Sequence, residues 1–460
     1  MYNNGLFIFR RDLRIVDNNT LYALNEQCKR VHTIFIFTPE QVSPTNQFKS
    51  TNAVQFMIES LADLAKQISE RGGGGELYTL YGHNDKVIAD CIRAWKIDVV
   101  GFNIDYSPYA IKRDESISAL CERLGVHLIR EHDYYLHVPG SILTSGGKSP
   151  YQKFTPYYES AMQIPVEPAK RARKIHLVDG PRSKPNNTIT LEDAHRRFVG
   201  QANPEILVHG GRVNAIQMLK RAVKTQTHYS DTRDKPAKPT SQLSAAIKFG
   251  CVSIREVYHA FRGNAPFVRQ LVWRDFYANI LFAFPHVLGH AMKPNYQRIK
   301  WHHNSAWFKA WCNGQTGYPI VDAGMRQLNR TGYMHNRVRL IVASFLTKTL
   351  LISWEHGEKY FAKNLTDYDP ASNNGNWQWI ASTGVDSQPY FRIFNPMEQG
   401  KRVDPDCEYI KTWVPELSEL SAREIHGWEG QIKNIDYPPP ICDYRAQKEA
   451  ALKMYADVFV

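Results

Sequence analysis

Short apolar runs alternate with amphipathic stretches through the first 130 residues of the chain. The apolar runs are rich in β-branched and aromatic residues, as buried strands are, and they occupy 6–11, 31–39, 77–82, 97–106 and 126–133. Between them, 51–70 and 85–95 carry apolar residues at the 3.6-residue spacing of helices. This alternation predicts βαβ units, and therefore an α/β domain with a parallel, doubly wound sheet over residues 1–130.

The pattern changes after that domain. Residues 131–205 are rich in proline, glycine and basic side chains and have little periodicity, which predicts a long interdomain connector. From 206 to 460 apolar residues recur at helical spacing without a competing strand pattern, so we expect an all-α domain. A glycine run at 72–75 precedes a strand rather than following one, so we expect a flexible turn there and not a phosphate loop.

Composition adds a class of partner. A chain of 460 residues exceeds the roughly 250–300 residues that one core supports, and 43% hydrophobic residues are enough for a folded protein. The formal net charge of +12 favours polyanions, with nucleic acid as the leading partner. At this point a merely basic soluble surface explains the charge equally well.

Cysteine usage and the chain start indicate a soluble intracellular protein. The seven cysteines are scattered and form no CxxC pair, so we expect neither a disulfide framework nor a zinc site. The first residues do not form a signal peptide, and no stretch reaches the roughly 20 apolar residues of a membrane span. We therefore expect no membrane partner, a monomer, and a reducing compartment, which would be the cytoplasm, or the nucleus in a eukaryotic or viral host.

Aromatic residues concentrate in the helical half, where nine of the ten tryptophans lie. Core packing explains most of them, but tryptophan is also readily oxidised by one electron and is a stacking platform for bases. Trp377 and Trp379 lie in the asparagine- and glycine-rich stretch 372–384, where a solvated turn is the usual expectation. A DNA-binding surface would need basic side chains among such aromatics, and the sequence supplies Arg274, Arg337, Arg339 and Arg392.

Two polar clusters in this half have more than one interpretation. Thr240, Ser241 and Ser244 precede an apolar helical run, either to cap the helix or to form an anion site at its N-terminus. A second cluster forms either structural ion pairs or a ligand pocket, and it contains Asn336, Arg337, Arg339, Asp367 and Asp369. No spacing suggests a metal site, a serine nucleophile or a pair of hydrolytic carboxylates, so a redox cofactor would have to carry the difficult chemistry.

Six motifs follow one another in the order of a known family. They are FRRDLRIVDN, TSQLS, LVWRDFY, GYPIVDAGMRQLNRTGYMHNRVRLIVASFL, ISWEHGEKYF and NNGNWQWIASTGVDSQPYFRIFNP. Over nearly the whole chain they resemble the photolyase/cryptochrome flavoprotein family, most closely the class I cyclobutane pyrimidine dimer DNA photolyases. The resemblance implies an N-terminal α/β domain that can hold an antenna pigment and a helical domain that binds U-shaped FAD in a cavity open to DNA. It leaves open whether a second chromophore is a folate, a deazaflavin, a flavin or absent.

Matched position by position, the motifs imply a set of FAD-binding residues. Asn373 would face flavin N5, where a neutral amide favours the reduced anionic flavin used in repair. The isoalloxazine ring would be surrounded by Asn336, Arg339, Asp367 and Asp369. Thr240, Ser241 and Ser244 would contact the diphosphate, which favours the anion site over the helix cap, and the other contacts would be Tyr229, Gln242 and Leu243.

The resemblance also implies an electron relay and a DNA surface. Trp377, Trp354 and Trp301 would pass electrons from the surface to the flavin during photoreduction. Trp273 and Trp379 would flank a flipped-out dimer. The remaining DNA and lesion contacts would be Gln270, Arg274, Asn336, Arg337 and Arg392. The implied reaction is light-driven: an electron passes from photoexcited reduced FAD to the cyclobutane dimer, the ring splits, and the electron returns.

Three residues depart from the family pattern. Gln270 replaces a glutamate common in cyclobutane-dimer photolyases and is shared with (6-4) photolyases and animal cryptochromes. Leu340 and Asn376 replace a methionine and a glycine. The alternatives are therefore a (6-4) photolyase, although its two histidines would fall on Asn336 and Leu340, and a photosensory cryptochrome. A cryptochrome predicts a long C-terminal extension, for which the residues after 443 leave little room.

Overall fold

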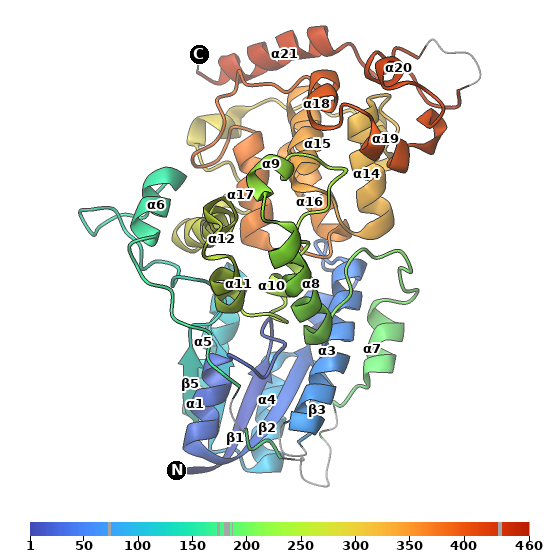
Figure 1. Ribbon diagram of the computed structural model, residues 1–460. Coiled ribbons are helices and arrows are strands. Elements are labelled where there is room, and N and C mark those ends of the chain that lie inside the picture. Colours follow the sequence, from blue (N-terminus) through green and yellow to red (C-terminus); the bar gives the residue numbers. More distant parts are fainter. Residues whose placement is uncertain (72–74, 173–174, 179–184, 186, 431–434, 460) are drawn as a thin grey trace.

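A computed structural model describes residues 1–71, 75–172, 175–178, 185, 187–430 and 435–459. It has an N-terminal α/β part and a larger helical part stacked on it (Figure 1). The fold class predicted from the sequence is confirmed. The glycine run at 72–74 and parts of the connector lie outside the described residues, so the predicted turn at 72–75 stays a prediction.

The N-terminal sheet has five parallel strands in the order β3-β2-β1-β4-β5. The strands are β1 (Tyr2–Phe9), β2 (Cys28–Phe37), β3 (Leu77–Tyr81), β4 (Val99–Asn103) and β5 (His127–Glu131). Alternate residues of β1 pack into two different cores, with Phe7 and Phe9 on one face and Leu6 and Ile8 on the other. Because both faces are covered, the inner strands β2, β1 and β4 carry long apolar runs that were visible in the sequence, whereas the edge strand β5 has no buried residue.

Helices connect these strands and cover both faces of the sheet (Figure 1). They are α1 (Asn19–Gln27), α2 (Pro39–Val42), α3 (Thr51–Arg71), α4 (Asn84–Trp95) and α5 (Pro108–Arg123). The strand order reverses at β1, so the carboxyl ends of β1 and β4 form a crevice of the kind where α/β sheets bind ligands. The helical part lies over these carboxyl ends.

The connector contains two short helices that its composition did not predict, α6 (Phe154–Ala161) and α7 (Leu191–Phe198). Each has eight residues, about two turns, which is too short for a periodic apolar pattern to stand out. α6 packs on α12 (Ala265–Ala283) of the helical part, and α7 packs on α3. The connector therefore fastens the two parts together as well as joining them.

The described residues from 206 onward form helices and no strand, as predicted. None of the described helices is long and apolar enough to cross a membrane. Besides α12, the helices are α8 (Arg212–Thr225), α9 (Tyr229–Thr232), α10 (Ser244–Lys248), α11 (Ile254–Phe261), α13 (Ser305–Asn313), α14 (Pro319–Thr331), α15 (Asn336–Lys348), α16 (Trp354–Asn364), α17 (Pro370–Ile380), α18 (Pro396–Val403), α19 (Glu408–Trp413), α20 (Ala422–His426) and α21 (Tyr444–Ala456), with 3-10 turns η1 (Pro285–Val287), η2 (Pro294–Arg298), η3 (Pro415–Leu417) and η4 (Asp457–Phe459).

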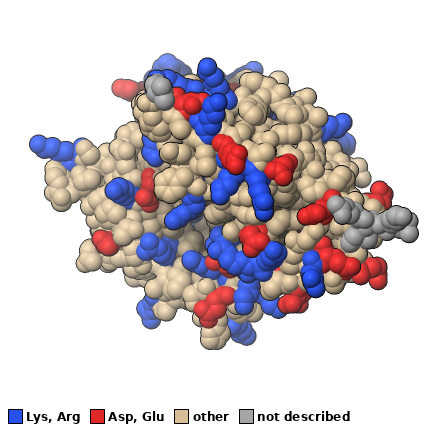
Figure 2. All heavy atoms as spheres, turned by 90° about the horizontal axis from the view of Figure 1, so that it is seen from above, with Lys and Arg blue, Asp and Glu red and all other residues tan. Residues whose placement is uncertain are grey.

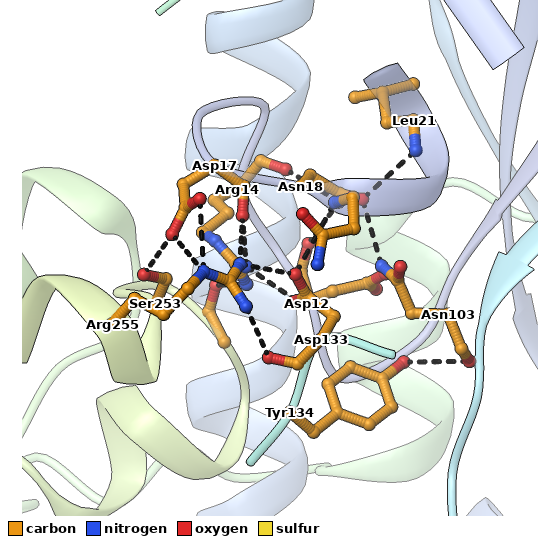
Figure 3. A network of polar contacts seen from close by, with 12 residues as sticks. Asp12, Arg14, Asp17, Asn18, Leu21, Asn103, Asp133, Tyr134, Ser253 and Arg255 are labelled. Atoms are coloured by element: carbon orange, nitrogen blue, oxygen red, sulfur yellow. Dashed lines mark hydrogen bonds and ion pairs between the residues drawn. The ribbon is translucent and has the colours of Figure 1, made fainter. Parts of the chain in front are cut away.

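A buried ion-pair network joins the two parts (Figure 3). Asp133, just after β5, accepts from Arg14 at 2.6 Å and from Arg255 of α11 at 2.7 Å. Arg255 Nε also donates to Asp17 at 3.0 Å. Since a buried charge is costly unless it is paired, each carboxylate depends on its arginines, and the FRRDLRIVDN motif acquires a structural role at this interface.

Candidate cofactor and nucleic-acid site

Most of the asparagine- and glycine-rich stretch 372–384, where a solvated turn is the usual expectation, lies in helix α17. Asp369 caps it, since its Oδ1 accepts from the backbone N–H of Ser372 at 3.1 Å, and Pro370 occupies the first helical position. Gly375 lies where α17 crosses α12, because a Cβ at this position would come within 2.1 Å of the Tyr277 ring. The asparagines and the glycine therefore build a helix that packs tightly, and not a loop.

The two tryptophans of α17 point in different directions, as residues two apart in a helix must. Trp377 is buried against Phe361, with ring centroids 4.9 Å apart, and against Trp311 at 6.3 Å. Gly357 of α16 leaves room for it, because a Cβ there would lie 2.1 Å from the Trp377 ring. Trp379 is only half-buried. One tryptophan thus belongs to the core, and the other stays accessible.

Asn373 and Asn374, also on α17, are fixed by α16. The Nδ2 of Asn373 donates to the backbone carbonyl of Glu358 at 3.0 Å, while the Nδ2 of Asn374 donates to Glu358 Oε1 at 3.0 Å. Burial raises the pKa of Glu358 to about 7. The side-chain amide of Asn373 therefore has a defined orientation, in which its carbonyl oxygen is the polar atom left for another partner. Glu358 and Asn374 had no signal in the sequence beyond the motifs that contain them.

The second polar cluster contains an ion pair between Arg339 and Asp367, in which one carboxylate oxygen lacks a partner among the described residues. Arg339 donates from Nη2 to Asp367 Oδ2 at 2.9 Å and from Nε to the carbonyl of Met334 at 2.8 Å. The other oxygen, Asp367 Oδ1, is buried and has no hydrogen-bond partner among the described residues. A buried carboxylate oxygen without a donor is costly. The ring N–H of an isoalloxazine is a donor of the right kind, so the residues present fit FAD.

A contact between the two parts of the molecule was not predicted. Arg11, from the loop after β1, donates to Asp369 Oδ2 at 2.9 Å, so the α/β part holds the residue that caps α17. Burial alone would raise the pKa of Asp369, but Arg11 and Arg274 hold it below its ordinary value. The residues are 358 positions apart, so no local pattern could have paired them.

The hydroxyl segment before α10 corrects one interpretation. The residue at the N-cap position is Leu243, which is buried, and no side chain caps the helix. Thr240 instead contacts the Tyr333 hydroxyl at 3.2 Å, and Ser241 Oγ accepts from the Leu243 N–H at 3.5 Å. Capping therefore does not explain Thr240, Ser241 and Ser244.

The other residues predicted near the diphosphate lie around this segment. Gln242 has a left-handed backbone, φ 57°, and its side chain accepts from Arg221 at 2.9 Å. Tyr229 is half-buried, with its ring 5.3 Å from that of Phe267, and Ser244 is exposed. These placements bring the segment to the surface of the helical part, and cofactor binding by these six residues stays a prediction.

The predicted lesion-contacting residues Gln270 and Trp273 lie three positions apart on α12, and therefore on one face. Trp273 stacks on Phe154 of the connector helix α6, with ring centroids 3.6 Å apart and ring planes 4° from parallel. Gln270 donates from Nε2 to the carbonyl of Pro266 at 3.4 Å, which leaves its Oε1 as an acceptor. Phe154 was missed because a single aromatic residue in an aperiodic connector gives no signal.

The three arginines predicted to contact DNA differ in their surroundings. Arg274 donates to the carbonyl of Tyr134 at 2.7 Å and lies over the Tyr135 ring, and Arg337 is paired with Asp234 at 2.7 Å. Arg392 is exposed. Figure 2 shows Lys and Arg gathered over the middle of the face seen from above, with Asp and Glu among them. Asn336, at the start of α15, is also exposed.

The three tryptophans of the predicted relay lie in or against one core. Trp354 begins α16 and is buried in the same cluster as Trp377, and Trp301 is half-buried against that cluster. Trp301 also packs edge-on against Tyr455, with ring centroids 6.1 Å apart. Trp377 and Trp354 are therefore buried in one core and Trp301 is partly exposed beside it, and electron transfer among the three stays a prediction.

The departure at Asn376 is explained by exposure. Asn376 lies on the solvent side of α17 and donates from Nδ2 to the carbonyl of Ser372 at 2.8 Å, four residues earlier. Leu340, the second departure, is half-buried against the core of the helical part. Neither position requires the family's usual residue for packing.

Two cavities lie near the interface of the two parts. The one at the carboxyl ends of β1 and β4 has a volume of about 10 Å³ and is lined by residues that include Arg11, Asp105 and Asp369. This space holds about one water molecule. The larger one, about 570 Å³, lies under the connector, with Tyr135, His137 and Arg255 in its wall. The identity of an antenna pigment stays open.

Comparisons with known proteins match DNA photolyases over nearly the whole chain. A model of the family described as DNA photolyase matches residues 6–173, and one described as the FAD binding domain of DNA photolyase matches 267–457. A deoxyribodipyrimidine photo-lyase of Halobacterium salinarum is 37% identical over 98% of both chains.

Solved structures have the same fold over the whole length. An archaeal photolyase from Sulfolobus tokodaii, whose crystal structure contains two FAD molecules, is 37% identical and superimposes with a TM-score of 0.89 over 99% of this chain and 100% of its own. A cryptochrome from Synechocystis is 26% identical, with a TM-score of 0.89 over 99% of each chain. The chain therefore belongs to the DNA photolyase family, and its helical part is the family's FAD-binding domain.

Proposed function

We propose that this protein is a deoxyribodipyrimidine photo-lyase, a light-dependent enzyme that splits cyclobutane pyrimidine dimers in DNA. The observation that carries the proposal is helix α17, which presents Asn373 and Trp377 to the core and Trp379 to an accessible side, and which packs on α12 beside Trp273. When bound and reduced, FAD supplies the electron that light makes available to the lesion.

The chain's own residues hold the flavin ring in this proposal. Asp367 Oδ1, which has no hydrogen-bond partner among the described residues, would accept the N–H of the flavin ring, and Arg339 would orient this carboxylate. Asn373, fixed by Glu358, would offer its amide oxygen to flavin N5. A neutral amide adds no negative charge beside the reduced ring, so it does not oppose the anionic form. Thr240, Ser241 and Ser244 hold the diphosphate.

Lesion binding uses the aromatic side of the same helices. Trp379 and Trp273 stack on a dimer that has been flipped out of the duplex, and Gln270 hydrogen-bonds to a base edge through its free Oε1. Flipping costs a few kcal/mol, and less for a damaged pair that stacks poorly. The net charge of +12 and the exposed Arg392 offset this cost by binding phosphates.

The specific lesion is the finer part of the proposal. A (6-4) photolyase needs a proton donor at the lesion, and the positions that would supply histidines hold Asn336 and Leu340. His335 next to them is buried and faces the core, with its pKa lowered to about 4 by burial and by Arg339. A histidine that stays neutral at pH 7 is a poor acid, so cyclobutane dimers are the better substrate.

The test uses oligonucleotide duplexes that carry one defined lesion. The holoenzyme, chemically reduced, is illuminated with blue light beside a dark control, and the lesions are counted by chromatography. We expect light-dependent loss of the cyclobutane dimer and none of the (6-4) product. Repair of the (6-4) product alone would change the lesion assignment, and repair of neither lesion would favour a photoreceptor.

A further inference from the structure

Lys348, the last residue of α15, is a completely buried lysine. Burial, together with the neighbouring Arg392, lowers the pKa of its ammonium to about 7. In the described part of the chain no carboxylate forms an ion pair with it. Lysines are almost never fully buried without a charged partner, because transferring an ammonium out of water is costly. Packing alone therefore does not explain this residue.

The ammonium of Lys348 joins two segments of the site. Its Nζ donates to the hydroxyl of Ser382 at 2.9 Å and to the backbone carbonyl of Arg392 at 3.2 Å. Ser382 follows the end of α17, the helix of Trp377 and Trp379. Arg392 lies in the loop between α17 and α18. One side chain thus fixes the loop relative to the helix.

The loop between α17 and α18 has a fixed base and an exposed edge. At its base Tyr455 donates to the carbonyl of Ala381 at 2.8 Å, and Tyr390 stacks on Tyr455 with ring centroids 5.9 Å apart. At its edge Phe391 is 64% exposed and the side chain of Arg392 is exposed beside it. A large exposed aromatic next to an arginine is suited to contact with nucleic acid, where it can fill the space between bases.

We propose that Lys348 is a positioning residue for DNA binding, which fixes the backbone of Arg392 so that the side chains of Arg392 and Phe391 project toward the duplex. This inference rests on the proposed function. An ammonium suits the role because it offers three donors at the end of a long stem, and a hydrogen bond from a charged donor to a carbonyl is stronger than one from a neutral donor. Lys348 does not touch DNA or flavin itself.

The test measures DNA binding and its salt dependence. The holoenzymes of wild type, Lys348→Met, Arg392→Ala and the double variant are titrated in the dark with a duplex containing one cyclobutane thymine dimer. Loss of one ordered phosphate contact should raise Kd on the order of tenfold and reduce the slope of log K against log salt by about 1. Lys348→Met should match Arg392→Ala in both quantities, and the double variant should be no weaker than either.

Controls separate positioning from folding. Lys363→Met, an exposed lysine on α16, should bind DNA like the wild type. A structural role alone would lower the melting temperature of Lys348→Met and leave its salt slope unchanged, which would overturn the inference, as would additive losses in the double variant.

A second variant covers the case in which Lys348→Met does not fold. Ser382→Gly removes one partner of the ammonium without strain, since Ser382 already has φ 66°. We expect a smaller rise in Kd that does not add to that of Arg392→Ala, and an unchanged Kd would contradict the inference. Failure of the proposed function is seen separately, as absence of dimer binding and repair by the wild-type protein.

Discussion

Two groups of buried charges in this protein differ in how completely their members are paired. At the interface of the two parts, Asp17 and Asp133 each accept from arginine (Figure 3). Between α16 and α17, Asp367 keeps one buried oxygen without a donor among the described residues. The two carboxylates of the first group are paired by the chain itself, and they stabilise the fold. Asp367 keeps an acceptor that FAD would complete in the proposed function.

The largest expected effect comes from breaking the paired group. Arg255→Ala leaves Asp17 and Asp133 short of a buried cation, so the free energy of unfolding should fall by about 3–5 kcal/mol. Urea denaturation of the holoenzyme measures it. Arg330→Ala, which breaks an exposed pair with Glu205, is the control and should lower the stability much less, because solvent screens this pair. Equal losses of unfolding free energy in the two variants would mean that the buried network stabilises the fold no more than an exposed ion pair does.

A change at Asp367, the carboxylate with one free oxygen among the described residues, should affect cofactor binding more than folding. Asp367→Ala removes an acceptor of the flavin and the partner of Arg339, so FAD affinity should fall by about 1.5–3 kcal/mol, roughly ten- to a hundredfold in Kd. The FAD retained after gel filtration and a fluorescence titration measure this. The protein without cofactor should lose less stability than Arg255→Ala does, because Arg339 is partly exposed and one oxygen of Asp367 has no donor to lose among the described residues. Full FAD binding with a large loss of stability would reverse the assignment.

A substitution in the predicted tryptophan relay should slow photoreduction of FAD and leave repair unaffected. Trp354→Phe replaces a buried indole by a ring that is harder to oxidise and keeps the apolar contact. Photoreduction of oxidised FAD should become much slower, while repair by chemically reduced enzyme should stay nearly intact. Transient absorption and the repair assay measure the two. Trp413→Phe, outside the predicted relay, is the matched control, and an equal loss of both activities in Trp354→Phe would refute the relay.

The buried lysine gives a pH dependence with a definite sign. The pKa of Lys348 is about 7 in the folded protein and 10.5 ordinarily, so between these values the unfolded chain binds more protons. The stability of the wild type relative to Lys348→Met should therefore rise as the pH increases from 7 to 10.5. Thermal denaturation of both proteins in parallel measures it. A difference that does not vary with pH would show that the lysine is not desolvated.

The smallest effect concerns Asn376. Since this side chain is exposed, Asn376→Gly should cost about 0.5 kcal/mol through helix propensity alone. The flavin absorption spectrum and the repair yield should not change. A spectral shift would place Asn376 at the flavin and contradict the orientation of α17.

The sequence was sufficient for the parts of the fold that have a strong local pattern. The inner strands of the sheet were visible because both their faces are buried, and α3 and α4 because they are long and amphipathic. The helices α6 and α7 were not, since two turns hold too few apolar positions. Of the two interpretations of Thr240, Ser241 and Ser244, helix capping does not hold, because Leu243 occupies the cap position and no side chain caps α10.

The candidate site residues were predicted from motifs, but the residues that contact and orient them were not. Trp377, Asn373 and Asp367 followed from the resemblance, but the residues that hold them come from distant segments. Arg11 reaches Asp369 across 358 positions, and Phe154 reaches Trp273 from the connector. Such contacts depend on how distant segments pack together, and no local pattern in a single sequence indicates that packing.

The most direct measurement is a crystal structure of the holoenzyme with a duplex that contains a cyclobutane thymine dimer. The account predicts the flavin on the Asn373 side of α17, with a ring N–H on Asp367 Oδ1, and the dimer against Trp379 and Trp273, with α17 as the wall between them. A flavin that does not reach Asp367, or a dimer bound away from both tryptophans, would contradict it.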